Sequence, residues 1–458
     1  MTKRAVRNAL RSGWRIGICL FILSVSVHAQ GRNPIILIPG LTGSELKHKV
    51  TGEKVWFKAL KPKSEDLRLP ISTSIEKMHD DLIPGDIIRE VKIGIFPATD
   101  VYGGFIRAME MRAGYHEESW KDPSDDGDRD AIYVFAYDWR LDNVENARRL
   151  VHDVEALKRK LKRPDLKFDI VAHSMGGIIS RYAAMYGNAE LPTGNRKAVP
   201  TWAGAKLFDK VILLGTPNEG AVSSLGSMLN GYSVGGLRID LPFIQDSSKF
   251  TVFTIPSAYQ LLPAPGTFRA FDEKLKPMSI DLYDPKMWSK YGWNAIEDDE
   301  FNDQFDLAEQ KIATAFFTAA LDRAKRLHEA LAASNGKAEG VAIYLVGSDC
   351  KTALDGVVLY QDGKKWKTLV RPKGFTRADG SRVTDDELKN VMQSAGDGVV
   401  TQRSLEAVTQ SQSAKVASIL KNQPVKLVCE DHNKLAANAR IQDYIISVLG
   451  GKESTIGN

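Results

Sequence analysis

The sequence predicts an α/β fold, with a mostly parallel central sheet and helices on both of its faces. Two observations support this prediction. Short apolar runs alternate with amphipathic helical segments along the chain, which is the pattern of successive βαβ units. The apolar runs also stop at Gly, Pro or polar residues, as strands do where they leave a sheet. With 458 residues, 43% of them hydrophobic and 26% charged, the chain is long enough to bury a large core.

The predicted core elements can be placed from their hydrophobic spacing. Apolar runs predict strands, and apolar residues at three- and four-residue spacing predict helices. Strands are expected at residues 34–38, 131–136, 168–172, 210–214, 341–347 and 425–428, and helices at 143–161, 175–186 and 306–333.

Two stretches interrupt the alternation, at about residues 44–100 and 219–300. They are rich in Gly, Pro and aromatic residues and show little regular periodicity. Insertions of this length in a compact α/β core are usually lids or binding loops. We therefore expect one catalytic domain over residues 30–458 with two cap insertions.

The N-terminus has the three parts of a secretion signal. A basic stretch precedes an apolar run at residues 16–27, and Val27-His28-Ala29 offers small residues for cleavage before Gln30. The run is shorter than the ~20 apolar residues of a permanent membrane-spanning helix. Residues 1–29 are therefore predicted to be a signal peptide, and the mature protein is expected to be periplasmic or secreted.

The positive charge of the chain resides in this N-terminal segment. The formal net charge is +5, and five cations with no acidic residue precede Gln30, so residues 30–458 are neutral in sum. A neutral protein offers no electrostatic case for binding nucleic acid. The five cations are Lys3, Arg4, Arg7, Arg11 and Arg15.

Two cysteines remain after residue 29, Cys350 and Cys429. In an oxidising compartment a small even number of cysteines favours a disulfide. Both cysteines follow predicted strands, so they would meet at one sheet edge if those strands are neighbours. We expect this disulfide; the alternative is two free thiols.

The segment Ala172-His173-Ser174-Met175-Gly176 lies between a predicted strand and a predicted helix. This is the context of a nucleophile elbow, in which a serine occupies a sharp turn and small residues stand two positions before and after it. The helix that follows places backbone N–H groups beside developing negative charge. Ser174 is the predicted nucleophile.

A serine needs a base to take its proton, and in α/β-hydrolases the order along the chain is Ser, acid, His. Only His328 and His432 follow Ser174. His328 falls within a predicted long helix, where a surface or packing role is expected. His432 lies in a loop between a strand and the last helix, and is the predicted base.

The acid must precede His432 and lie near a strand end. Asp397 is favoured because Gly396 and Gly398 would let its carboxylate approach the imidazole closely. Asp355, which is nearer the strand at 341–347, remains a competitor. Asp431 is expected to cap the final helix.

The transition state of acyl transfer also needs two donors for an oxyanion. Met175 N–H is one candidate. The glycine-rich segment Pro39-Gly40-Leu41-Thr42-Gly43 follows the first strand and leaves backbone amides free. Leu41 N–H is the predicted second donor, with Thr42 as the alternative.

Five motifs in register make the chain resemble the lecithin:cholesterol acyltransferase family, which includes lysosomal phospholipases and phospholipid:diacylglycerol acyltransferases. The resemblance extends over nearly all of residues 34–450 and implies the α/β-hydrolase fold. The motifs are Pro39-Gly40-Leu41-Thr42-Gly43-Ser44-Glu45-Leu46, Tyr137-Asp138-Trp139-Arg140, Ala172-His173-Ser174-Met175-Gly176, Leu214-Gly215-Thr216-Pro217 and Gly396-Asp397-Gly398-Val399-Val400.

The resemblance implies roles for several residues. It implies Asp397 rather than Asp355 as the acid and His432 as the base, and it supports Leu41 and Met175 as oxyanion donors. It also implies that the segment with Trp56 and Phe57 touches membrane or lipid. Ala172 stands where many members have glycine. The early insertion lacks the cysteine pair of the animal enzymes, so lipoprotein-style activation is not carried over.

Two weaker patterns remain open. The loop with Asp122, Asp125, Asp126, Asp128 and Asp130 is acidic, but Tyr133 stands where a calcium loop would place its last acidic ligand, which favours a solvated turn. Trp288, Tyr291 and Trp293 could line an acyl channel or form the core of the second cap.

The sequence thus predicts an exported serine-dependent lipid O-acyltransferase or phospholipase that needs neither metal nor cofactor. Its expected partners are a phospholipid or acylglycerol at a membrane or micelle surface, and an alcohol acceptor such as a sterol or diacylglycerol. A lipase or carboxylesterase acting on simpler esters is the alternative, and a non-enzymatic binding protein on the same scaffold is the third hypothesis.

Overall fold

The computed structural model describes residues 31–57, 67–91, 99–194, 196–233, 246–333, 339–409, 418–421 and 423–451. Contacts divide the chain into residues 1–31 and a compact unit of residues 32–458. The predicted signal peptide lies outside the described residues. Within the described ranges, no helix has both the length and the apolar character that crossing a bilayer requires.

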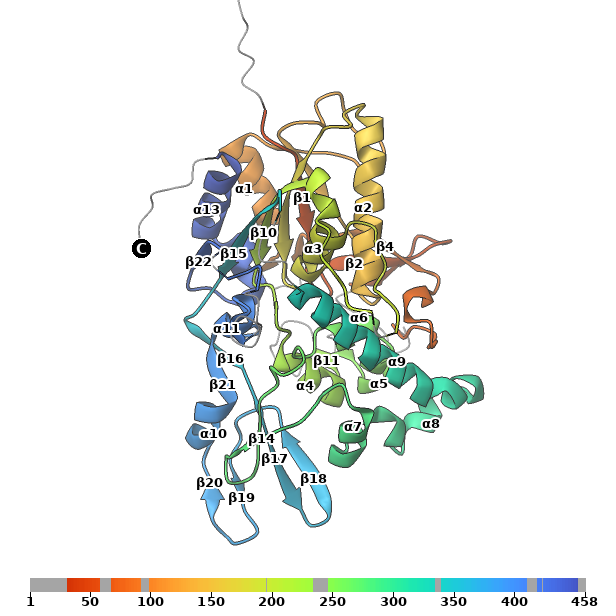
Figure 1. Ribbon diagram of the computed structural model, residues 1–458, viewed down its shortest axis with the longest axis vertical. Coiled ribbons are helices and arrows are strands. Elements are labelled where there is room, and N and C mark those ends of the chain that lie inside the picture. Colours follow the sequence, from red (N-terminus) through yellow and green to blue (C-terminus); the bar gives the residue numbers. More distant parts are fainter. Residues whose placement is uncertain are drawn as a thin grey trace, which may run out of the picture. The chain divides into compact units, whose positions relative to one another are not determined.

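A seven-stranded sheet forms the centre of the compact unit (Figure 1). Its order is β22-β15-β10-β9-β1-β8-β7, and every neighbouring pair is parallel. The predicted α/β-hydrolase fold class is confirmed. The strands are β1 (Ile35–Ile38), β7 (His116–Glu117), β8 (Ala131–Val134), β9 (Phe168–His173), β10 (Phe208–Leu214), β15 (Ala342–Gly347) and β22 (Val425–Leu427).

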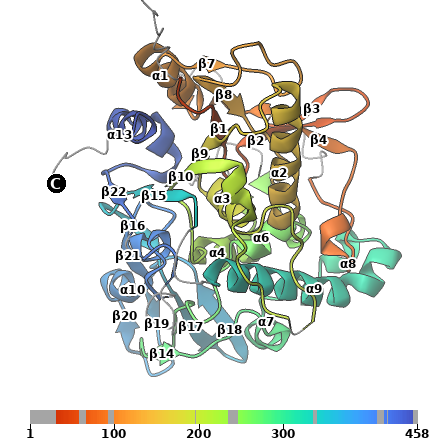
Figure 2. The ribbon, with the colours of Figure 1, turned by 45° about the horizontal axis from the view of Figure 1, so that its top comes forward.

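Alternate residues of the central strands enter two separate hydrophobic clusters, one on each face of the sheet. In β1, Ile36 and Ile38 pack with the helices α2 and α3, whereas Ile35 and Leu37 pack with α1 and α13. Figure 2 shows these two helix pairs on opposite sides of the strands. Burial on both faces explains why every residue of β1 is Ile or Leu. The helices are α1 (Gly103–Ala113), α2 (Asn143–Lys160), α3 (Met175–Tyr186) and α13 (Ala439–Leu449).

The first predicted insertion contains a small antiparallel sheet of order β3-β2-β4. Its strands are too short to show periodicity in the sequence, which is why only an irregular insertion was predicted there. Its elements are β2 (Ser44–His48), β3 (Lys54–Trp56), η1 (Ile75–Lys77), β4 (Leu82–Ile87), β5 (Glu90–Val91) and β6 (Thr99–Asp100).

The second insertion consists of short helices and two-residue strands, followed by the long helix α9 (Leu307–Ala332). A capping box at Asp306 and Glu309 fixes the start of α9. The other elements are α4 (Val222–Asn230), β11 (Tyr232–Ser233), β12 (Asp246–Ser247), α5 (Lys249–Phe253), α6 (Pro256–Gln260), β13 (Ala270–Phe271), β14 (Pro277–Met278), α7 (Pro285–Tyr291), η3 (Ala295–Glu297) and α8 (Phe301–Gln304).

A third excursion from the sheet, which was not predicted from the sequence, begins after β15 and ends at β22. Its strand β17 joins the second insertion by pairing in parallel with β13, and β17 and β18 form a hairpin. The Asp362-Gly363 pair at the hairpin turn is a sequence signal for this structure. The elements are β16 (Lys351–Leu354), β17 (Val357–Asp362), β18 (Lys365–Leu369), β19 (Phe375–Thr376), β20 (Arg382–Val383), α10 (Asp385–Met392), β21 (Gln393–Gly396) and α11 (Gln402–Leu405).

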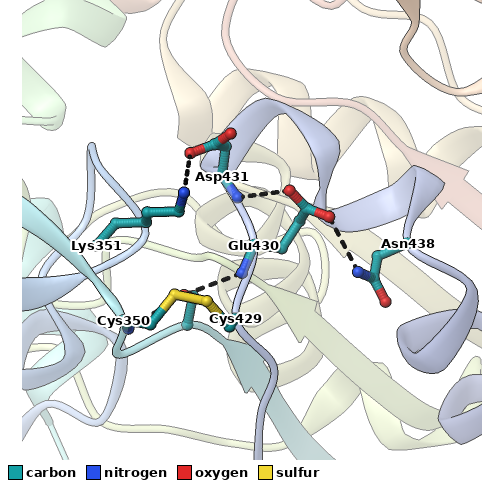
Figure 3. The surroundings of a disulfide bond; sticks show 7 residues. Cys350, Lys351, Cys429, Glu430, Asp431 and Asn438 are labelled. Atoms are coloured by element: carbon teal, nitrogen blue, oxygen red, sulfur yellow. Dashed lines mark hydrogen bonds and ion pairs between the residues drawn. A yellow bond between two sulfur atoms is a disulfide. The ribbon is translucent and has the colours of Figure 1, made fainter.

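A disulfide joins the two ends of this excursion. Strands β15 and β22 are neighbours, and Cys350 and Cys429, which follow them, are bonded with their Cα atoms 5.3 Å apart. Figure 3 shows two polar contacts beside the bond. Lys351 lies 3.3 Å from Asp431, and Asn438 donates to Glu430 at 3.0 Å. These contacts and the disulfide hold the segment that leads to His432.

Replacing both cysteines by serine should lower the free energy of unfolding. The bond closes a loop between residues 79 positions apart, and losing such a constraint on the unfolded chain costs about 3–4 kcal/mol. Urea unfolding of the Cys350→Ser/Cys429→Ser protein, compared with oxidised and reduced wild type, measures this difference. Equal midpoints for the variant and the oxidised protein would contradict the expectation.

Candidate active site

Ser174 occupies a sharp turn between β9 and α3, with backbone angles φ 52° and ψ −124°. A positive φ is strained for any residue with a side chain, and such strain is found where the surrounding structure imposes it. Here the turn has no room for side chains nearby. A Cβ on Gly176 would lie 2.6 Å from Pro39 O, and one on Gly177 would lie 2.0 Å from Thr216 Oγ1.

The structure brings the three predicted residues Ser174, His432 and Asp397 together in a row. His432 Nε2 lies 2.9 Å from Ser174 Oγ, and His432 Nδ1 lies 2.7 Å from Asp397 Oδ2. Both distances are hydrogen-bond distances, so the imidazole can accept the serine proton at one nitrogen while the carboxylate accepts from the other. His432 is the first residue of the short helix η4 (His432–Ala437).

Asp397 is held as a carboxylate although it is buried. Burial opposes its ionisation, but His432 and the amides of Val399 and Val400 outweigh that effect and hold the pKa of Asp397 below its usual range. The two amides donate to Asp397 Oδ1 at 3.0 and 2.7 Å. This leaves Oδ2 for the imidazole.

Gly215, at the end of β10, provides the space in which the acid and the base meet. Its φ is +57°, and a Cβ there would lie 3.0 Å from both Asp397 Oδ2 and His432 Nδ1. The backbone conformation and the lack of space both favour glycine.

The competing residues have other partners. The carboxylate of Asp355 is bound by Arg403 at 2.8 Å and by Arg269. His328 is buried in α9 with 1% of its surface exposed.

Asp431 does not cap the final helix, because Asn438 does so by accepting from two amides of its first turn. Asp431 instead precedes η4 and pairs with Lys351 and Lys434. The expectation for Asp431 was wrong because the short helix η4 intervenes before α13.

The predicted oxyanion loop packs directly against Ser174. A Cβ on Gly40 would lie 2.8 Å from Ser174 Cβ. The amide of Gly40 is occupied, because it donates to Tyr102 Oη at 2.8 Å. The Leu41 amide and the Met175 amide at the start of α3 have no acceptor in the part of the chain that the structure describes. They can therefore donate to a substrate oxygen.

Trp56 is buried and is therefore not available to a membrane surface, which corrects the expectation from the resemblance. It is 1% exposed, and its indole N–H donates to Thr42 O at 2.9 Å. Trp56 therefore supports the oxyanion loop from the core. Phe57 is half-buried and packs against the same core.

A small cavity of about 40 Å³ with a mostly apolar wall adjoins the oxyanion loop. Leu41 and Trp139 line it from the core, and Tyr232, Val252 and Leu261 line it from the second insertion. The apolar part of this wall suits the alkyl part of a lipid.

The aromatic residues that could have lined an acyl channel form cap core instead. Trp288, Tyr291 and Trp293 are 1%, 3% and 4% exposed and pack on one another. Two aspartates of the acidic loop form ion pairs with arginines: Arg129 contacts Asp126, and Asp128 binds Arg129 and Arg163.

Comparisons with known proteins bear on the family and the fold of the chain. The family model described as lecithin:cholesterol acyltransferase matches residues 127–339. The family resemblance is confirmed. The matched segment contains the Tyr137–Arg140 motif, Ser174 and the second insertion. No curated protein matches the chain.

Three solved structures match this chain at low sequence identity, and only the first has a TM-score above 0.5. A chain of the Tle4–Tli4 complex superposes with a TM-score of 0.55 at 13% identity, over 92% of this chain and 98% of that chain. The lipase BlEst2 of Bacillus licheniformis in mature form gives a TM-score of 0.33 at 12% identity, over 92% and 93%. EstA from Clostridium botulinum gives 0.34 at 13% identity, over 92% and 88%.

Replacing His328 by Leu should make the stability of the protein less sensitive to acid. Burial lowers the pKa of His328 to about 4, whereas an unfolded histidine titrates near its ordinary value of 6.5. As pH falls from 6.5 to 4, the unfolded state binds a proton that the folded state does not, so this group destabilises the fold by about 1.4 kcal/mol per pH unit.

The difference between the two proteins isolates this effect. Burial raises the pKa of Glu145 to about 7 and that of Asp169 to about 6, and both groups act in the opposite direction. Urea unfolding of wild type and His328→Leu at pH 6.0, 5.5 and 5.0 gives the two slopes. Parallel slopes would mean that His328 is not buried in its neutral form.

Proposed function

We propose that this protein is an exported, serine-dependent enzyme that takes an acyl group from a lipid ester and transfers it to an alcohol or to water. The observation that carries the proposal is the hydrogen-bonded row Ser174–His432–Asp397 beside an apolar cavity. The family match supports an enzyme of the lipase, phospholipase or acyltransferase kind. The basic and apolar N-terminal motif supports export to the periplasm or medium.

In the first half of the proposed reaction, His432 Nε2 takes the proton of Ser174 as Oγ attacks the ester carbonyl carbon. The carbonyl oxygen becomes an anion, and the amides of Leu41 and Met175 donate to it. Asp397 keeps the proton on His432 Nδ1 and stabilises the imidazolium. The ester C–O bond then breaks, His432 protonates the leaving alkoxide, and the acyl group stays on Ser174.

The second half repeats these steps with a new nucleophile. His432 removes a proton from an alcohol or a water molecule, whose oxygen attacks the acyl-enzyme. Collapse of the second intermediate returns the proton to Ser174 Oγ and releases a new ester or a free acid. Both acceptors use the same residues, so the choice between them depends on whether water is kept out of the site.

The substrate class follows from the cavity and the family. An apolar space lined by Leu41, whose amide is the proposed oxyanion donor, would place an acyl chain beside the carbonyl that Ser174 attacks. We therefore propose phospholipids or acylglycerols, presented at a membrane or micelle surface, as acyl donors. A sterol or a diacylglycerol is the proposed alcohol acceptor.

Replacing Ser174 by Ala should lower ester turnover at least about 10³-fold, because the nucleophile is lost while the oxyanion donors remain. Turnover of a soluble p-nitrophenyl ester measures this loss. Ser180→Ala is the matched control, since its hydroxyl lies on the same helix and only donates to Gly176 O. Unchanged turnover in the Ser174 variant would exclude the proposed acyl-enzyme.

The acceptor can be identified from the products of a labelled lipid. We expect the wild-type enzyme, incubated with acyl-labelled phosphatidylcholine vesicles containing diacylglycerol or a sterol, to release label as new ester, as free acid, or as both. Separation of the two products measures the partition. Turnover of short soluble esters with no release from vesicles would instead favour the simpler lipase or carboxylesterase.

A further inference from the structure

A continuous chain of hydrogen bonds joins the oxyanion loop to the segment that carries His432. The Gly40 amide lies 2.8 Å from Tyr102 Oη, which lies 2.8 Å from His173 Nδ1. The other ring nitrogen, His173 Nε2, lies 3.0 Å from the carbonyl oxygen of His432. Tyr102 and His173 are 2% and 6% exposed, so water does not compete for these bonds.

The chemistry of the two ends fixes the direction of every bond in this chain. A carbonyl oxygen only accepts, so His173 Nε2 must carry the proton that it donates to His432 O. His173 Nδ1 then has a free lone pair and accepts from the hydroxyl of Tyr102. The oxygen of Tyr102 in turn accepts from Gly40 N–H. With a neutral imidazole, each donor has one acceptor and no alternative arrangement satisfies all three bonds.

Burial keeps both side chains in the neutral forms that this arrangement needs. It lowers the pKa of His173 to about 3, so the imidazole carries a single proton at neutral pH. Burial also raises the pKa of the Tyr102 hydroxyl, which therefore keeps its proton. The chain of bonds is consequently stable over the pH range in which an ester-cleaving enzyme works.

The chain connects three parts of the site through residues directly adjacent to them. Gly40 precedes Leu41, the proposed oxyanion donor; His173 precedes Ser174; and the last acceptor is the backbone of His432 itself. A displacement of about 1 Å between such groups can cost about 10²-fold in rate. A rigid link between them therefore has a direct effect on the reaction.

We propose that Tyr102 and His173 are positioning residues that set the place of Leu41 N–H relative to Ser174 and His432. This inference rests on the function proposed above. Without the Tyr102 hydroxyl, Gly40 N–H loses its acceptor and the oxyanion loop loses its tie to the base. Transition-state stabilisation then falls, while the cavity walls that come from the second insertion, Tyr232, Val252 and Leu261, stay in place.

Tyr102→Phe tests the proposal with little change in side-chain volume. We expect kcat for a soluble p-nitrophenyl ester to fall about 10- to 100-fold with KM unchanged. The inhibition constant of a trifluoromethyl ketone, which forms an oxyanion on Ser174, should rise by a similar factor. All values are taken per active site, counted by titration with a p-nitrophenyl phosphonate.

Tyr133→Phe is the matched control. Tyr133 is equally buried in β8, and its hydroxyl donates at 2.8 Å to Gly127 O, away from the site. Tyr102→Phe loses two buried hydrogen bonds and Tyr133→Phe loses one, so both variants should unfold at lower urea concentration. A purely structural role for Tyr102 would lower the number of active sites in the same way as Tyr133→Phe and leave kcat per site and the inhibitor ratio unmoved.

A second pair of variants keeps the proposal testable if Tyr102→Phe fails to fold. Gln at position 173 retains an acceptor and a donor, whereas Leu retains neither, so His173→Gln should keep more of kcat per site than His173→Leu. Equal losses in this pair, or Tyr102→Phe behaving like Tyr133→Phe, would overturn the inference alone. Full turnover in Ser174→Ala would remove the proposed function, and the inference with it.

Discussion

The arrangement of the candidate site depends on the strained backbone of Ser174. A φ of 52° turns the chain abruptly from β9 into α3, and this turn leaves the hydroxyl at the end of the strand, within reach of His432. The neighbouring segments must then come very close. That closeness explains glycine at positions 40, 176 and 177, where a Cβ would meet another atom at 2.8 Å or less. The positions of the glycines around Ser174 are therefore explained by the lack of space for a side chain.

The parallel sheet provides the second condition, because it brings distant parts of the chain to one edge. The oxyanion loop follows β1, Ser174 follows β9, Gly215 ends β10 and His432 follows β22. All four segments leave the carboxyl ends of parallel strands, which is where α/β proteins form their sites. Asp397 reaches the same edge by a different route. It follows β21, a strand of the third excursion, and the amide of His432 donates to its carbonyl at 2.8 Å.

Two arginines near the site bind carboxylates that come from different parts of the chain. Arg140, which is fully buried, is bound by Asp138 and Asp80 and so ties the first insertion to the core. Arg403 similarly joins Asp355 of the third excursion to Glu219 at the root of the second insertion. Removing one partner of such a buried pair leaves an uncompensated charge, which is strongly destabilising. These pairs hold the insertions against the sheet edge.

The sequence alone predicted those parts of the molecule whose hydrophobic residues recur at regular spacing or whose backbone is sterically constrained. Six of the seven sheet strands, the helices α2, α3 and α9, and the meeting of Ser174 with His432 could be predicted because burial on two faces and the elbow turn leave clear patterns. The edge strand β7, His116–Glu117, is short and polar and was not predicted. The flanking glycines favoured Asp397 over Asp355, and the family resemblance made the same choice; the sequence alone left Asp355 as a competitor because it also lies beside a glycine.

Other features depend on contacts between distant residues and could not be predicted. Trp56 was expected at a lipid surface, yet tertiary packing places it under Thr42. The third excursion was not predicted because its strands are short. In addition, the strand that pairs with β17, β13, lies about ninety residues earlier in the chain. The hydrogen bond between Tyr102 and His173 could not be predicted, because Tyr102 lies at the start of α1 and His173 lies at the end of β9, 71 positions later in the chain.

Because of the disulfide, the positions of Asp397 and His432 should respond differently to changes in the length of the chain between Cys350 and Cys429. Cys350 and Cys429 join the two ends of the third excursion, so His432 is tethered covalently to the sheet whatever the length of the chain between them. Asp397 lies inside that closed loop and is held by hydrogen bonds alone. Insertions or deletions in the β17–β18 hairpin or at residues 376–382 should therefore leave the base in place. Insertions or deletions in the segment that immediately surrounds Asp397 would move the acid away from His432. We therefore expect homologous proteins to vary in length before β21 but not between β21 and Asp397.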